Sequence, residues 1–119
     1  MQNWYGWFIE QSFDDQSIFR MFQTVKMKSE EEDWKEHVVQ IPEANLDTAL
    51  DWLTKHIKPS WYAHLVDGDK MIIVYKNKLF KLKQGDSFKE VDDYGRQQGI
   101  IEEQLPNINL FKLARDSGF

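Results

Sequence analysis

The sequence of 119 residues contains no cysteine and only three histidines, which limits the chemistry available to the chain. Without a thiol there is no disulfide, no cysteine nucleophile, no thiolate-bound zinc and no iron–sulfur cluster. The histidines are His37, His56 and His64. A metal site would have to combine imidazole with carboxylate ligands, or use carboxylates alone.

Several other signatures are absent. No apolar run approaches the ~20 residues that span a bilayer, and no charged-then-apolar leader is present. The net charge of −5 disfavours general nucleic-acid binding, because binding to the phosphates depends on clustered cations. The sequence also lacks a G-x-S-x-G motif, a phosphate loop and a dinucleotide fingerprint. We therefore expect a cytoplasmic protein that binds neither membranes nor nucleic acid.

The length allows one domain with one substantial core. We expect a single α+β domain over residues 1–105 and a C-terminal arm over residues 106–119. The arm contains apolar residues without a clean period, so it either lies across the domain or docks onto a partner.

Hydrophobic periodicity predicts most of the secondary structure. In chain order we expect a strand over 4–12, a two-turn helix that begins near residue 18, a strand over 23–29, a strand over 34–41, a helix over 42–57, three strands within 59–83 and a helix over 86–99. The alternative to the short helix is a single hairpin that runs straight on from residue 18. The helix over 42–57 is the clearest, because Leu46, Ala49, Leu50, Leu53 and Ile57 form one apolar stripe.

Short-range signals mark the ends of several elements. The pairs 67–68 (Asp-Gly) and 76–77 (Lys-Asn) predict tight turns, since glycine and asparagine accept positive φ. Ser87 and Glu90 form a capping box for the last helix, and Gly99 is placed to end it.

The strand over 23–29 alternates apolar and polar residues, which places Val25 and Met27 on one side. The acidic run "SEEED" over 29–33 follows it. Like charges at this density keep a segment solvated, and a metal-binding loop would alternate its oxygens and include a glycine. We expect a solvated hairpin loop there.

The first strand, "NWYGWFIEQSF", does not alternate apolar with polar residues. The order strand, helix, strand, strand, helix, strand is that of the ferredoxin-like βαββαβ fold, with an extra hairpin and a C-terminal helix appended. In that fold the first strand lies between the Trp34 and Trp61 strands, covered on both faces. We therefore predict an α+β fold with an antiparallel sheet and two main helices; the alternative is an antiparallel meander with helices on one side.

One hypothetical site unites Glu10, His37 and His64, one residue from each of three strands that this fold makes neighbours. Two imidazoles and a carboxylate could hold a divalent metal or act as an acid–base pair, with Tyr62 beside them. No two of these residues form a local ligand motif, so we assign no metal and no cofactor.

A second hypothesis rests on the aromatic residues, which suit both small-molecule pockets and protein interfaces. The candidates for a ligand site or interface are Trp4, Trp7, Trp34 and Trp61, accompanied by Tyr5 and Tyr62. If helices cover only one face of the sheet, the other face would expose a large apolar patch that needs a ligand, a dimer mate or the C-terminal arm to cover it.

Two stretches, "KPSWYAHLVDGDKMIIVYKNKLFKL" (58–82) and "YGRQQGIIEEQL" (94–105), resemble segments of a family of small prokaryotic proteins. The family has no established activity, so the resemblance implies no catalytic residue. Ile101 stands where the family pattern has a proline, so the resemblance does not carry over a sharp turn at that point.

These observations predict a binding or interaction module that associates with itself, as a homodimer or larger homo-oligomer, through an apolar sheet face or the C-terminal arm. A small-molecule ligand is a further expected partner. The alternative is a small enzyme with a pocket lined by His, Tyr and Trp on the sheet face, in which His64 or His37 is the acid or base.

Overall fold

The computed structural model describes residues 2–30, 34–106, 109–116 and 118, and of residues 28–30 and 34 it describes the backbone alone. In chain order the elements are β1 (Asn3–Ile9), the 3-10 turn η1 (Glu10–Ser12), α1 (Ile18–Met21), β2 (Gln23–Glu30), β3 (Trp34–Pro42), η2 (Glu43–Asn45), α2 (Leu46–His56), β4 (Ala63–Asp67), β5 (Lys70–Tyr75), β6 (Lys78–Lys83), α3 (Lys89–Gln97), η3 (Glu102–Gln104) and α4 (Asn109–Asp116).

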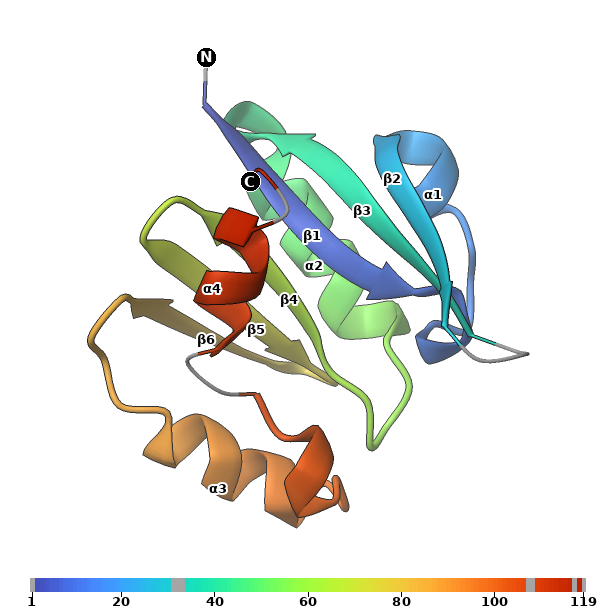
Figure 1. Ribbon diagram of the computed structural model, residues 1–119. Helices are drawn as coiled ribbons and strands as arrows, with labels where there is room; N and C mark the ends of the chain where they lie inside the picture. Colours follow the sequence, from blue (N-terminus) through green and yellow to red (C-terminus); the bar gives the residue numbers. More distant parts are fainter. Residues whose placement is uncertain (1, 31–33, 107–108, 117, 119) are drawn as a thin grey trace.

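Strand β1 lies inside a single antiparallel sheet (Figure 1). It pairs with β3 on one side and with β4 on the other, and the strand order is β2-β3-β1-β4-β5-β6. The predicted α+β class, antiparallel sheet and internal first strand are therefore confirmed. A simple meander is wrong, because β3 separates β1 from β2. The β5–β6 hairpin extends the same sheet.

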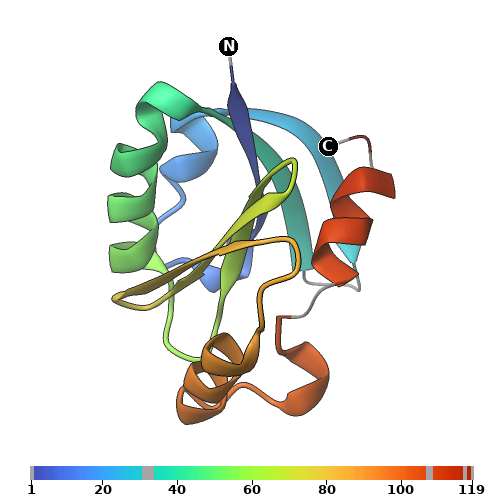
Figure 2. The same ribbon diagram turned by 90° about the vertical axis from the view of Figure 1, so that its left-hand side faces the viewer.

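Helices cover both faces of this sheet. Figure 2 shows α1 and α2 on one side and α4 on the other. Ile18 of α1 and Leu53 of α2 share one core with Phe8 of β1, whereas Val91 of α3 and Phe111 of α4 share the other core with Trp7. The arm predicted over 106–119 thus contains the helix α4, which packs on the second face of the sheet. The part of this face beneath α4 needs no ligand or dimer partner to bury it.

The unbroken apolar character of β1 follows from this two-sided burial. Trp4 and Phe8 belong to the core beneath α2, and Trp7 belongs to the core beneath α4. Gly6 is needed for this packing, because a Cβ at that position would overlap the ring of Phe8. Such a strand, buried on both faces, has no polar side to alternate with.

Two predicted elements at the start of the chain are longer than the observed ones. The first strand ends at Ile9 rather than residue 12, because Ser12 closes a 3-10 turn by donating from Oγ to the Ile9 carbonyl at 2.6 Å. The predicted two-turn helix is a single turn, α1. Asp15 lies just before it and accepts the backbone N–H of Ser17 at 2.7 Å, as a carboxylate near a helix start does.

The prediction that Val25 and Met27 share one side of β2 is wrong. The register passes from Thr24 opposite Val39 to Lys26 opposite Val38, so Val25 is the extra residue of a β-bulge. Val25 packs against the core beneath α4, and Met27 is exposed. The predicted loop over 29–33 lies in part outside the described residues.

The predicted turns and the helix over 42–57 are confirmed. Gly68 and Asn77 take positive φ values of 60° and 62° in the two hairpins, and α2 buries Ala49, Leu50 and Leu53. None of the helices in the described segments is long and apolar enough to cross a membrane.

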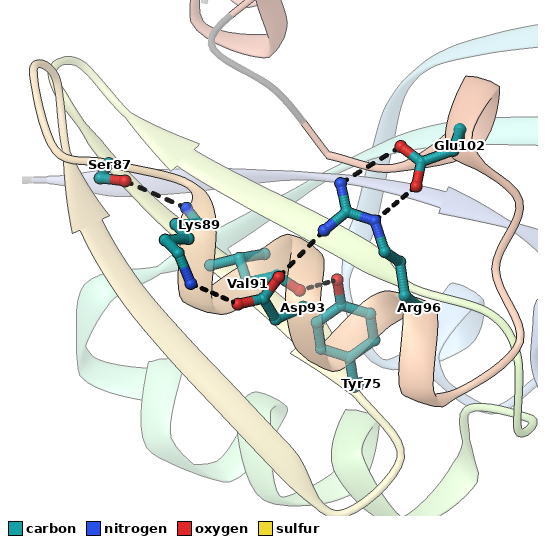
Figure 3. A network of polar contacts seen from close by, with 7 residues as sticks. All are labelled: Tyr75, Ser87, Lys89, Val91, Asp93, Arg96 and Glu102. Carbon is teal, nitrogen blue, oxygen red and sulfur yellow. Dashed lines mark hydrogen bonds and ion pairs between the residues drawn. The ribbon is translucent and has the colours of Figure 1, made fainter.

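Helix α3 begins and ends close to the predicted points. The Ser87 hydroxyl accepts the N–H of Lys89 at 3.1 Å rather than that of Glu90, because Phe88 occupies the N-cap (Figure 3). At the other end Gly99 turns the chain with φ of 86°. After two further residues the chain enters η3.

Buried and exposed contacts both hold α3 and the segment after it in place (Figure 3). The hydroxyl of the fully buried Tyr75, on β5, donates to the Val91 carbonyl at 2.9 Å. Arg96 contacts Asp93 at 3.0 Å and forms a two-pronged ion pair with Glu102. The Arg96–Glu102 pair ties η3 to α3, which matters because residues on both sides of Glu102 line the cavity described next.

Candidate functional site

A cavity of about 220 Å³ lies on the α4 side of the sheet. The strands contribute Trp7, Ile9, Glu36 and His64 to its wall. The segment before β4 contributes Ser60, Trp61 and Tyr62, and the rest of the wall comes from Ile100, Gln104, Leu110 and Leu113. Four segments that are far apart in the sequence therefore meet at one hollow.

The strand register explains why the first group comes together. Trp7 of β1 lies opposite His64 of β4, and Ile9 lies opposite Glu36 of β3. Alternate residues of a strand point to the same face, so Trp7 and Ile9 present neighbouring side chains to the α4 side. Helix α4 and the segment around η3 close over them.

His64 is the most unusual polar residue of the cavity. Its side chain is stacked on Trp7, and the residue is only 7% exposed. Burial lowers its pKa to about 4, so the imidazole is neutral at pH 7. Its Nε2 atom is buried and has no hydrogen-bond partner among the described residues. Buried polar atoms are nearly always hydrogen-bonded, so an atom without a partner in this position is unusual.

Tyr62 shares the cavity with His64 and keeps its proton. Burial, together with a smaller effect of the Asp92 and Glu36 carboxylates, raises the pKa of Tyr62 to about 12. Glu36 itself lines the cavity. No lysine or arginine is among the described lining residues.

The cavity brings together four of the residues predicted for a site: Trp7, Trp61, Tyr62 and His64. Trp4 lies instead in the core on the other face of the sheet. The side chain of Trp34 lies outside the described part of the chain.

The hypothetical grouping of Glu10, His37 and His64 does not form one site. His37 pairs with Phe8, whereas His64 pairs with Trp7, so the two imidazoles are on opposite faces of the sheet. The structure does bring Glu10 near His37, with 3.6 Å between Oε2 and Nε2. In the described segments no three His, Asp or Glu side chains are placed to hold a metal ion.

The surroundings of His37 are those of a packed strand residue. Its Nδ1 lies 3.2 Å from the Thr24 hydroxyl, and the centroid of its ring lies 4.4 Å from the centroid of the Phe19 ring. His56 likewise contacts Asp14 at 2.9 Å, which joins the end of α2 to the loop before α1. Neither histidine lines the cavity.

Sequence reasoning did not single out Glu36, Ile100, Gln104 or Leu110. Glu36 is recognisable only once the pairing of Ile9 with β3 is known. The other three lie in the region after α3, where the apolar residues have no clean period. The available signal was the aromatic and histidine content of the strands and of the segment before β4. It identified the part of the wall that these segments form, and not the part that comes from the region after α3.

This chain matches no protein-family model, no curated protein and no solved structure. The functional assignment is therefore argued from the geometry of the cavity.

Proposed function

We propose that this protein is a binding module for a small organic molecule, which occupies the cavity beside His64. The observation that carries this proposal is the buried Nε2 of His64, which lacks a partner among the described residues in a wall that is otherwise largely apolar and aromatic. A ligand that pairs with this atom would satisfy it, while the apolar wall buries the rest of the ligand.

The volume fits this proposal. At about 220 Å³ the cavity is below the range typical for drug-sized ligands, so a single-ring or similarly small molecule suits it. Indole and phenol side chains supply apolar area and a polar tip, which is the composition of many small-molecule sites.

The second candidate function is the predicted small enzyme, favoured by the presence of Tyr62 and His64 in one cavity. We rank it below binding, because a general base works best with a pKa near the working pH. His64, with a pKa of about 4, is a weak base at pH 7, and Tyr62 retains its proton.

Three probes of similar size test the binding function: benzylammonium, benzyl alcohol and benzoate. We expect at least one to shift the NMR signals of His64 and Ile100 in a saturable way. Leu110→Trp places an indole at the cavity wall and should weaken this binding, whereas Lys112→Trp adds the same group at an exposed position of α4 and should not. Absence of binding by all three probes at millimolar concentration would contradict the proposal.

Self-association stays a separate prediction. The apolar sheet face proposed for it carries α4 in the described structure. Two large apolar residues of the C-terminal part of the chain are exposed: Leu113, on α4, and Ile101, just before η3. A dimer in sedimentation experiments that is lost in the double variant Ile101→Ser/Leu113→Ser would support this route, and a strict monomer at high concentration would exclude it.

We also propose that β1 to β4, with α1 and α2, form a ferredoxin-like unit. The antiparallel pairing of β1 with both β3 and β4, and of β2 with β3, supports this assignment. The single turn of α1 and the added β5–β6 hairpin are departures from that unit.

A further inference from the structure

The segment that leads into β4 meets the end of α3 at the edge of the cavity. Ser60 directly precedes the lining residues Trp61 and Tyr62, and Gln98 lies two residues before Ile100, which also lines the cavity. The Ser60 hydroxyl donates to the Gln98 carbonyl, so one hydrogen bond joins two parts of the cavity wall. Resting on the proposed binding function, we propose that Ser60 is a positioning residue that sets the upper size limit of the ligand.

The backbone of Ser60 is held in an unfavourable conformation. Its φ of 67° lies in the left-handed region, which glycine adopts freely and serine does not. Among the described residues only one other non-glycine residue, Asn77 in the β5–β6 turn, has a positive φ. Strained residues persist only where their surroundings hold them, and they are concentrated at binding sites. Glycine would relieve the strain at position 60, so we attribute the serine to what its side chain does.

The surroundings of the Ser60 hydroxyl are arranged for this contact. Gln98 is the C-cap of α3, and the last carbonyls of a helix have no partner within it. The next residue is Gly99, where a Cβ would lie only 3.3 Å from the Ser60 Oγ. Glycine at that position leaves room for the hydroxyl to reach the backbone. The two segments are therefore in close contact at the level of the main chain.

This contact bears directly on the size of the cavity. The volume is about 220 Å³, which is below the range typical for drug-sized ligands. The hydrogen bond from Ser60 fixes the segment of Trp61 and Tyr62 relative to the segment of Ile100. Without it, the wall can separate around a larger molecule, and it loses the pre-formed fit to a small one.

The test compares probes that differ in size and carry the same polar group. Benzylammonium, benzyl alcohol and benzoate are paired with 2-naphthylmethylammonium, 2-naphthylmethanol and 2-naphthoate. NMR titration of the full-length protein gives, for each pair, the affinity for the naphthyl probe relative to that for the single-ring probe. A hydrogen bond has a net effect of about fivefold on an equilibrium constant, so this ratio should rise about fivefold in Ser60→Gly and in Ser60→Ala.

The two variants and a control separate the hydroxyl from the backbone. Ser60→Gly removes the hydroxyl and relieves the positive φ, whereas Ser60→Ala removes the hydroxyl and keeps the Cβ. Asn77→Gly relieves a positive φ outside the cavity and should leave the ratio unchanged. The titrations are run well below the unfolding temperature of each protein. A purely structural role of Ser60 would lower that temperature and leave the ratio as it is, because both probes bind the same folded state.

The results distinguish this inference from the proposed function. If the single-ring probes bind and neither Ser60 variant raises the ratio, the size-limit proposal is wrong while the binding function stands. A rise in Ser60→Gly without one in a folded Ser60→Ala, or an equal rise in Asn77→Gly, would also contradict it, because backbone freedom would then be the cause. If Ser60→Ala does not fold, Ser60→Gly and Asn77→Gly decide the question. If no probe binds any of these proteins, the binding function is wrong and the size limit falls with it.

Discussion

The rings of Trp7 and His64 are stacked with their centroids 5.2 Å apart and their planes inclined by 7°. The two residues are cross-strand partners on the internal strands β1 and β4. Their contact joins the core beneath α4 to the floor of the cavity. This pair of rings therefore contributes to the packing of the sheet and also lines the cavity in which we propose that a ligand binds.

Acid should destabilise the protein through His64. Its folded pKa of about 4 lies below its ordinary value of 6.5, so between these values the unfolded chain binds a proton that the folded chain does not. Stability should therefore fall as the pH drops from about 6.5 toward 4, by roughly 3 kcal/mol from this group. Urea unfolding at a series of pH values measures this loss.

The variant His64→Phe isolates that contribution. Phenylalanine keeps a ring against Trp7 and does not titrate, and Glu36 and Tyr62 remain in the cavity as in the wild type. The stability of the variant relative to the wild type should rise between pH 7 and pH 4. Parallel pH profiles of the two proteins would show that His64 is not buried and neutral.

Gly95→Ala should destabilise the protein, against the usual trend for helices. Alanine ordinarily stabilises a helix interior by up to about 1 kcal/mol relative to glycine. Here a Cβ would lie 2.7 Å from Leu105 Cδ2 and 2.9 Å from the Tyr75 hydroxyl, and both residues are buried. We expect a loss of about 1–3 kcal/mol in chemical denaturation.

Gln97→Ala provides the control for Gly95→Ala, since Gln97 is an exposed residue of the same helix. Its effect should stay within about 0.5 kcal/mol. A Gly95→Ala protein more stable than the wild type would contradict the close packing of α3 on β5.

Helix α4 should contribute strongly to stability through Phe111. This side chain is 2% exposed and packs in the core that contains Trp7. Phe111→Ala should lower the free energy of unfolding by about 3 kcal/mol or more, because it leaves a cavity in a packed core. Leu113→Ala, at a position that is 50% exposed, should change it by less than about 1 kcal/mol. Equal small effects of both changes in thermal unfolding would show that α4 does not pack on the sheet.

The sequence alone predicted the elements whose pattern is local. The stripe in residues 42–57 identified α2, and the missing alternation of the first strand placed β1 inside the sheet between two neighbours. Positive φ at Gly68 and Asn77 followed from residue type. These features depend on short-range periodicity or on backbone preference, which a single sequence displays directly.

Features that depend on pairing between distant segments were not predictable in this way. The bulge at Val25 reverses the side on which neighbouring residues lie, and it arises only against β3. The cover of the cavity by Ile100 and Leu110 comes from segments without a clear period. The sequence alone thus identified His64 and its aromatic neighbours as candidate site residues. That His37 lies on the opposite face of the sheet became clear only from the register of β1 with β3 and β4.

The central claim is that a small molecule binds in the cavity beside His64. The most direct measurement is the 15N signal of the His64 imidazole during titration with benzylammonium, compared between the wild type, Leu110→Trp and Lys112→Trp. We predict a saturable shift of the Nε2 signal in the wild type and Lys112→Trp that is weakened or lost in Leu110→Trp. An Nε2 signal that stays unchanged at saturating probe, or one that shifts equally in all three proteins, would contradict the claim.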